Sequence, residues 1–187
     1  MVIDVSSDAD RTVTVLVVED EANLLDLYEV WLAEAYTVRT ALTGAAARDE
    51  LDSTVDVMVL DRRMPDLSGD ALLRQLRAEG WTGPVGLVSA AEPDFDLLEL
   101  AFDAHLNKPV TREQLLAIVS RLIEVGTLDP EARALYRQLV KRTLLQETKN
   151  LVELAGHEAY ETLEAGVEEA MASLDDDRVE AVKHLVP

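Results

Sequence analysis

Short apolar runs alternate with amphipathic stretches along the first two thirds of the chain. Residues 13–18 form an apolar, β-branched run, and in residues 23–35 the large apolar side chains recur at helical spacing. The same unit recurs four times, with expected strands at residues 37–40, 55–60, 85–89 and 105–107 and expected helices at residues 44–51, 68–79, 94–102 and 111–125. Strands that are short and apolar on both faces are typical of a parallel sheet with helices on each side. The pattern therefore predicts a doubly wound, five-stranded α/β domain over residues 13–125.

Beyond this domain the strand pattern disappears and only helical patterns remain. The sequence Gly-Thr-Leu-Asp-Pro at residues 126–130 ends one helix with glycine and starts another with Asp-Pro. Two amphipathic stretches follow, over residues 130–154 and 157–174, with Gly156 between them. Three consecutive aspartates then either cap a last short helix or begin a frayed acidic end. We expect a C-terminal helical hairpin in a second unit, residues 129–187.

The charge balance of the chain is strongly acidic. It carries 37 Asp and Glu against 17 Lys and Arg, a formal net charge of −20, and only four of the basic residues are lysines. Dense carboxylates hold a hydration shell, and molar salt shortens the range of their mutual repulsion to about 3 Å. We interpret this as a salt-adapted composition, with an acidic protein of an ordinary habitat as the alternative. The negative excess also disfavours binding to nucleic acid and to anionic membranes.

The sequence lacks the features of secreted, disulfide-bonded and membrane proteins. No run of about 18 uncharged apolar residues occurs, and there is no cysteine for a disulfide, a thiolate metal site or a nucleophile. Residues 1–12 form an aperiodic acidic lead-in without the basic start and apolar stretch of a secretory signal. The sequence contains no Gly-rich phosphate loop and no nucleophile–base–acid set, so it gives no indication of an independent enzyme. We expect a cytoplasmic protein with no membrane partner.

Polar side chains gather at the strand ends where open parallel sheets bind ligands. They follow or end the first, third, fourth and fifth strands: Glu19, Asp20, Asp61, Ser89 and Lys108. Three carboxylates at one edge repel one another unless a hard dication neutralises them, and Mg²⁺ suits oxygen ligands. An acid that follows a strand can instead simply cap the next helix, and this alternative stays open for Glu19. The joint occurrence of these positions favours a Mg²⁺ site beside a lysine.

The same residues stand in a set of ordered motifs. These are Val-Val-Glu-Asp-Glu at 17–21, Val-Leu-Asp-Arg-Arg-Met-Pro-Asp-Leu-Ser-Gly at 59–69, Val-Ser-Ala at 88–90 and Lys-Pro at 108–109. With them, residues 13–125 resemble the receiver domain of two-component response regulators, which has a flavodoxin-like fold. The resemblance implies a phosphorelay protein that takes a phosphoryl group from a sensor histidine kinase.

The resemblance also implies a role for each residue of the reacting centre. Asp61 is the expected phosphoacceptor, Lys108 pairs with the phosphoryl group, and Ser89 hydrogen-bonds to it in the active state. Positioning and charge neutralisation do most of the work in such a transfer. The chain would then not be an enzyme, beyond Mg²⁺-assisted phosphorylation and dephosphorylation of itself.

The expected metal ligands follow from the same resemblance. Asp20 and Asp61 would bind Mg²⁺ directly, together with the backbone carbonyl of Arg63, and Glu19 would act through water. The side chain of Arg63 either points toward the phosphoryl region or faces solvent, and both alternatives stay open.

Two further features concern the fifth strand. Where most receivers carry Tyr or Phe as a rotamer switch, three residues before the lysine, this chain has His105. A histidine can swing inward behind Ser89, but it is smaller and titratable, and the alternative is a half-buried strand residue. Lysine followed by proline admits a cis peptide, which in this family's pattern aims Lys108 inward.

The helical hairpin is similar to the HalX domain that follows receivers in haloarchaeal regulators. Its first stretch is net basic and its second acidic, so the two helices should attract each other. We favour an interaction or homodimerisation module, since each helix alone has too little core. The alternative is a DNA-binding transcriptional regulator that uses one basic helix face: Arg133, Arg137, Lys141 and Arg142. A histidine phosphotransfer hairpin is a third, disfavoured possibility, with His157 as its only plausible residue.

Overall fold

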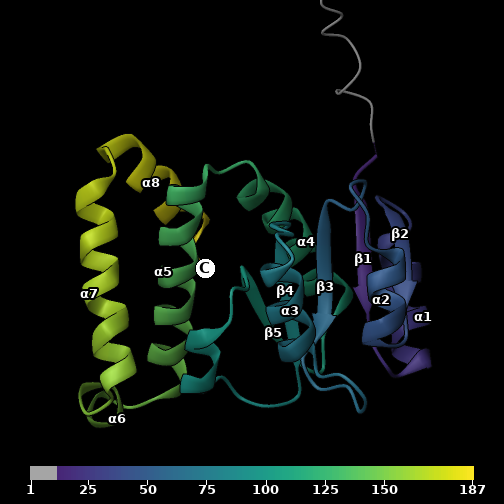
Figure 1. Ribbon diagram of the computed structural model, residues 1–187, viewed down its shortest axis with the longest axis horizontal. Helices are drawn as coiled ribbons and strands as arrows, with labels where there is room; N and C mark the ends of the chain where they lie inside the picture. The colour runs from purple at the N-terminus through teal and green to yellow at the C-terminus, as the bar shows by residue number, and fades with distance from the viewer. Residues whose placement is uncertain (1–11) are drawn as a thin grey trace, which may run out of the picture.

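A five-stranded parallel sheet forms the centre of the first part of the molecule (Figure 1). The computed structural model describes residues 12–187, so residues 1–11 of the expected lead-in lie outside the described residues. The strands pair in the order β2-β1-β3-β4-β5, and all neighbours are parallel. Their bounds are β1 Thr14–Val18, β2 Thr37–Ala41, β3 Val57–Asp61, β4 Val85–Ser89 and β5 Ala104–Asn107. The prediction of a doubly wound parallel sheet is confirmed.

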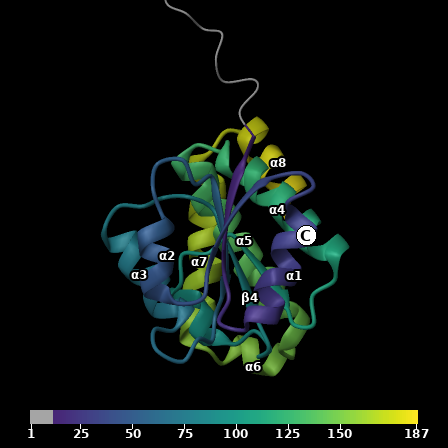
Figure 2. The same ribbon diagram turned by 90° about the vertical axis from the view of Figure 1, so that its right-hand side faces the viewer.

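Helices cover both faces of this sheet. Successive residues of a strand point to opposite faces, so Val15 and Val17 of β1 pack with α1 and α4, while Leu16 and Val18 pack with α2 and α3. Figure 2 shows the two helical layers on either side of the strands. Burial on both faces explains why the strands are continuously apolar in sequence. The helices are α1 Ala22–Leu32, α2 Gly44–Glu50, α3 Gly69–Ala78 and α4 Arg112–Gly126.

The prediction of a helix over residues 94–102 is wrong. Only a short 3₁₀ helix, η1, forms there, over Phe95–Glu99. In a 3₁₀ helix residues three apart share a face, and the apolar residues of this segment follow that spacing. Leu97 and Leu100 enter the core beneath the sheet, while Phe95 and Leu98 pack with the C-terminal helices. The segment thus divides its apolar side chains between two partners, which a longer amphipathic helix with a single apolar face would not do.

The C-terminal part, which we call the tail, contains helices only. It comprises α5 Pro130–Thr148, α6 Leu151–Ala155, α7 Glu158–Ser173 and α8 Asp176–Leu185. Helices α5 and α7 lie side by side and antiparallel beyond the β5 edge of the sheet (Figure 1). The expected hairpin is therefore present, and the side chain of Asp175 caps α8 by accepting from the Arg178 N–H. Within residues 12–187, no helix has the length and apolar character needed to cross a membrane.

The first helix of the hairpin ends at Thr148, earlier than the predicted residue 154. The side chain of Asn150 accepts hydrogen bonds from the backbone N–H groups of Val152 and Glu153, and the Glu153 carboxylate accepts from the Asn150 N–H. Such a capping box starts a new helix. The Asn-x-x-Glu spacing at residues 150–153 was the sequence signal for this break.

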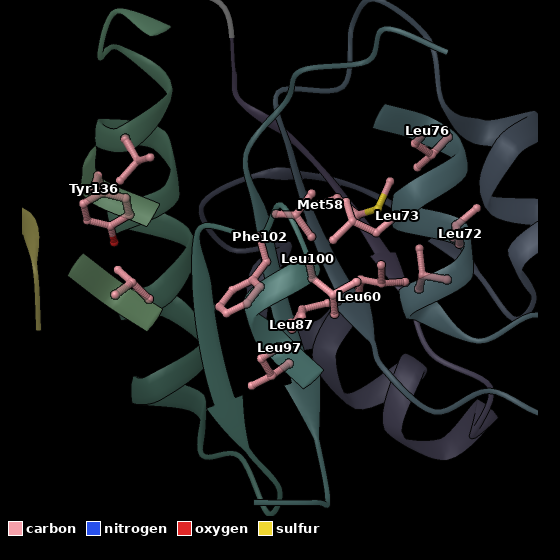
Figure 3. Close-up of a cluster of buried hydrophobic side chains, with 14 of the residues drawn as sticks. Met58, Leu60, Leu72, Leu73, Leu76, Leu87, Leu97, Leu100, Phe102 and Tyr136 are labelled. Atoms are coloured by element: carbon pink, nitrogen blue, oxygen red, sulfur yellow. The ribbon is translucent and has the colours of Figure 1, made fainter. Parts of the chain in front are cut away.

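The tail packs directly against the sheet domain, residues 13–126. One hydrophobic cluster runs from α3 through the sheet and η1 to α5, α7 and α8. In Figure 3, Phe102 lies between the sheet residues and Tyr136 of α5. Both aromatic rings are fully buried. The apolar stripe of the tail is therefore covered within this same chain.

The basic residues of α5 also face the sheet domain. Arg133 donates to both carboxylate oxygens of Asp103 at 2.8 Å, and Arg137 donates to one of them at 2.8 Å. Lys141 donates to a backbone carbonyl of η1 at 2.8 Å. Only Arg142 turns toward α7, where a glutamate oxygen lies 3.9 Å away. Three of the four residues of the proposed DNA-binding face are thus engaged inside the molecule, and the expected attraction between α5 and α7 is correspondingly small.

Candidate functional site

The carboxyl ends of β1, β3, β4 and β5 bring the predicted polar residues to one edge of the sheet. Glu19 and Asp20 follow β1, and Asp61 is the last residue of the neighbouring strand β3. One oxygen from each of these three carboxylates lies within 4.8 Å of the others. Ser89 ends β4 and Lys108 follows β5. The structure therefore gathers the three predicted carboxylates into one cluster.

Lys108 reaches across the end of β4 to this cluster. Its Nζ donates to Asp61 Oδ2 at 2.8 Å and to Glu19 Oε1 at 2.9 Å. Burial by itself would lower the pKa of Lys108, but the hydrogen bonds to the two carboxylates raise it above its ordinary value. The ammonium group is therefore charged at neutral pH. The Lys108–Pro109 peptide is cis.

The donor set of the cluster fits a hard dication. Glu19 is 1% exposed, and this burial, reinforced by the charge of Asp61 and opposed by the hydrogen bond from Lys108, raises the pKa of Glu19 to about 7. A carboxylate destabilised in this way gains from a nearby dication. Carboxylate oxygens are also the ligands that Mg²⁺ prefers. Glu19, Asp20 and Asp61 could thus hold a metal ion.

The loop after β3 fixes the Asp61 carboxylate. The backbone N–H of Arg63 donates to Asp61 Oδ1 at 3.0 Å, so this group and Lys108 hold the two oxygens from different sides. The Arg63 side chain itself is exposed to solvent. Gly69 lies so close to the Asp61 carbonyl that a Cβ would stand 2.2 Å from its oxygen. A residue without a side chain is needed here for the start of α3 to approach the strand.

Sequence reasoning missed Arg62, which directly follows Asp61. Its guanidinium is buried and binds Asp70 of α3 through Nε at 2.9 Å and Nη2 at 3.0 Å, and it also binds Asp96 of η1. Burial would lower the pKa of Arg62, but these two carboxylates raise it above its ordinary value. No sequence signal indicated this burial, because a charged residue directly after a strand is usually solvated.

Ser89 is buried at the end of β4. Its hydroxyl accepts a hydrogen bond from the backbone N–H of Ala91 at 3.0 Å, and its carbonyl accepts from the Lys108 N–H at 2.8 Å. The hydroxyl is thus engaged with the loop toward η1 and not with Asp61. Because the hydroxyl is the acceptor in this bond, its own O–H remains able to donate to a phosphoryl group, as the resemblance implies.

His105 is a residue of β5 at the interface of the sheet domain with the tail. It lines a cavity of about 280 Å³ between β5, α4 and α5, and its ring is edge-on to Phe102 at 6.5 Å. Within the described residues its Nε2 is buried without a hydrogen-bond partner. Burial, with a smaller effect of the Arg62 charge, lowers the pKa of His105 to about 4. The imidazole is therefore neutral at physiological pH, and its role as a switch stays a prediction.

The parallel sheet, the carboxylate cluster and the lysine together define a receiver-type phosphoacceptor fold. Residues 15–120, more than half of the chain, match the family model of the response regulator receiver domain. The chain belongs to this family, whose members work with sensor histidine kinases in two-component signalling. The match ends within α4, so it does not include the tail.

Relatives with sequence similarity fall into two groups. A "Putative transcriptional regulator" of Haloferax volcanii is 36% identical over 159 residues, which is 84% of this chain and 27% of that protein. "Sensory transduction protein RegX3" of Mycobacterium tuberculosis H37Rv is 33% identical over 118 residues, 60% of this chain and 52% of that protein. The chain thus spans only about a quarter to a half of the length of these relatives. The Haloferax match extends beyond the receiver into the tail.

Solved structures agree with this assignment. A BeF₃-activated DrrB receiver domain is 30% identical, with a TM-score of 0.56 over 61% of this chain and 99% of that one. A CheY-like receiver protein from Methanospirillum hungatei has a TM-score of 0.58 over 62% of this chain and 97% of that one, at 21% identity. The second similarity concerns the fold alone.

Proposed function

We propose that Asp61 is the phosphoacceptor of a two-component relay and that the tail passes the signal on. The observation that carries this proposal is the pairing of Asp61 with Lys108 at 2.8 Å beside two further carboxylates. Phosphorylation replaces one carboxylate oxygen lone pair with an O–P bond while the P–N bond to the kinase imidazole breaks. The electron pair of that bond stays on the imidazole nitrogen, which takes up a proton.

The groups around Asp61 match the needs of this transfer. Lys108 neutralises negative charge on the phosphoryl oxygens, and the Arg63 N–H keeps the carboxylate oriented for in-line attack. Glu19, Asp20, Asp61 and the backbone carbonyl of Arg63 would hold Mg²⁺, which supplies charge neutralisation when bound. In the phosphorylated form, the Ser89 hydroxyl, which accepts from the Ala91 N–H, donates its own proton to a phosphoryl oxygen.

Replacing Asp61 tests the proposal directly. The Asp61→Asn variant keeps the shape of the side chain and removes the nucleophile, so acetyl phosphate with Mg²⁺ should give no phosphoryl adduct by mass spectrometry. Asp66→Asn is the matched control, because Asp66 is an exposed acid of the same loop. An undiminished adduct on Asp61→Asn would refute the assignment.

The metal ligands are tested separately by thermal unfolding. Mg²⁺ should raise the melting temperature because it relieves repulsion among the carboxylates. Asp20→Ala should remove most of this rise, and Glu19→Gln should remove less, since Glu19 acts through water. An unchanged Mg²⁺ response of Asp20→Ala would rule out direct ligation by Asp20.

We assign the tail to the HalX type and give it the output role. The extension of the Haloferax match over 84% of this chain supports the assignment. The contacts of Arg133 and Arg137 with Asp103 favour a tail that works through the sheet domain over one that presents a basic face to DNA. A phosphorylation-dependent change in association state at high salt would support a homodimer through the tail, and steeply salt-dependent binding to promoter DNA would support the alternative.

A further inference from the structure

The short helix η1 is held from two sides by different parts of the chain. On one side stands Arg62, the residue after Asp61, and on the other side stands the tail. No other described segment contacts both the neighbour of the proposed phosphoacceptor and the tail through charged side chains. This position makes η1 a candidate for transmitting a signal between the two.

The contact on the sheet side is a buried arginine fork. Arg62 is 4% exposed, and its guanidinium is shared between Asp70 at the start of α3 and Asp96 in η1. Its backbone is equally fixed, because its N–H donates to the Val88 carbonyl and its carbonyl accepts from the Gly69 N–H, both at 2.9 Å. Arg62 is therefore a fixed point that ties the loop after Asp61 to the start of α3 and to η1.

The tail grips the same segment through polar and aromatic contacts. Lys149 pairs with Asp94 at 3.0 Å, just before η1. The rings of Phe95 and His157 stack at 3.6 Å with an interplanar angle of 5°. At the other end of η1, Lys141 donates to the carbonyl of residue 98 at 2.8 Å. Movement of η1 thus acts on α5 and on the start of α7 together.

We propose that Arg62 is the positioning residue that couples Asp61 to the tail, by holding η1 through its ion pair with Asp96. The inference rests on the proposed function of Asp61. This coupling is separate from the expected rotamer switch at His105. His105 is a neutral ring at the tail interface, and within the described residues its buried Nε2 makes no hydrogen bond.

The physical basis is the fixed geometry of the arginine. A phosphoryl group adds about two negative charges next to Arg62 and offers acceptor oxygens to the O–H of Ser89, whose hydroxyl is also bonded to the loop that leads into η1. The β4–η1 loop then shifts at its start, while Asp96 stays anchored to Arg62. The resulting rotation of η1 changes its stacking and ion pairs with the tail. Without the Arg62 anchor, the loop movement is absorbed inside residues 90–99.

Two carboxylates of η1 offer a matched comparison. Asp96 pairs with buried Arg62, while Glu99 pairs with the exposed Arg74 of α3 at 3.6 Å. The variants Asp96→Asn and Glu99→Gln each remove one charge from the same short helix and one ion pair, with the loop after β3 and with α3 respectively. Only the first disconnects η1 from the residue next to Asp61. Asp96→Glu serves as the conservative rescue.

The experiment measures hydrogen exchange in residues 135–149 of the full chain, with and without acetyl phosphate and Mg²⁺, in molar KCl. Mass spectrometry of the intact chain reports the phosphorylated fraction in each sample. We expect the phosphorylation-dependent change in protection to fall about threefold or more in Asp96→Asn and in Arg62→Met, at equal phosphorylation, and to persist in Glu99→Gln and Asp96→Glu.

The outcomes separate this inference from the proposed function. No adduct on the wild-type chain at Asp61 overturns the proposed function and this inference with it. An adduct without any response of the tail leaves Asp61 as the phosphoacceptor and overturns both the output role of the tail and this inference. A wild-type response that is equally large in Asp96→Asn leaves the proposed function standing and overturns the role of Arg62. Because Asp96 is an exposed side chain, Asp96→Asn keeps the comparison valid should Arg62→Met unfold.

Discussion

Substitution of Asp103 should destabilise the docking of the tail on the sheet domain more than substitution of any other single residue. Its carboxylate is fully buried between β4, β5 and α5, and it accepts from Arg133, from Arg137 and from the Val85 N–H at 2.8 to 2.9 Å. Burial would raise the pKa of Asp103, but the hydrogen bond from Arg133 and the charge of Arg137 hold it below its ordinary value. One fully buried carboxylate therefore balances two partly buried arginines.

The Asp103→Asn variant keeps the volume and leaves the arginines without a counter-charge. Removing one partner of a buried ion pair costs about 3 to 5 kcal/mol. For a chain of this length each kcal/mol lowers the melting temperature by about 2 to 4 °C, so a fall of about 6 to 20 °C is expected. Glu79→Gln is the control, because the Arg48–Glu79 pair is exposed and should contribute no more than about 1 kcal/mol.

Urea unfolding at pH 7 and hydrogen exchange along α5 would measure this effect. The double variant Asp103→Asn, Arg137→Met should lose less stability than the sum of the single changes, because the second change removes an uncompensated charge. Since the pKa of Asp103 is lowered in the folded state, its contribution is full above the ordinary value of 3.8 and is lost as pH falls below it. A destabilisation by Asp103→Asn no larger than that of Glu79→Gln would refute the reasoning.

Three further predictions concern other parts of the chain. Gly69→Ala should cost about 1 to 3 kcal/mol in urea unfolding and lower the phosphorylation yield, because its Cβ meets backbone, whereas Gly166→Ala, whose Cβ meets only the flexible Gln138 side chain, should not. Burial, with the charge of Arg137, lowers the pKa of Lys141 from 10.5 in the unfolded chain to about 8 in the folded chain. Between these pH values the unfolded chain binds more protons, so the free energy of unfolding should rise with pH. This rise should be steeper in the wild-type chain than in Lys141→Met, and equal pH dependence of the two would contradict the prediction. The melting temperature should rise from millimolar to molar KCl, because the net charge is −20, and a flat profile would contradict salt adaptation.

The sheet and its helices could be predicted because their sequence signals are local. The apolar run of β1 and the helical spacing of α1 each fall inside one short window, and a parallel sheet follows from the alternation of strands and helices. The segment around η1 could not be predicted in this way. Its apolar residues Leu97 and Leu100 pack in the core of the sheet domain, whereas Phe95 and Leu98 pack against the tail. The prediction of one amphipathic helix wrongly assigned all four side chains to a single apolar face.

The residues that we propose for phosphoryl transfer could be located from the sequence because they end or follow neighbouring strands of the sheet. The motif spacing indicated Asp61 and Lys108, and the structure joins them at 2.8 Å. Arg62 was not readable, because a charged residue after a strand is usually solvated, and only the positions of α3 and η1 reveal the carboxylates that bury it. The orientation of the basic face of α5 was likewise decided by Asp103, a residue far away in sequence.

The strongly acidic composition gives the buried contacts of the tail a particular importance. Salt at molar concentration shortens the screening length to about 3 Å, which weakens exposed ion pairs such as Arg48–Glu79 while screening buried pairs much less. The Asp103 node is fully buried, and the arginines that reach it are 12% and 23% exposed. At high salt, charged contacts that specify how two parts dock are therefore effective only where they are buried. The burial of Asp103 predicts that the tail stays docked at the salt concentrations where surface charges no longer interact.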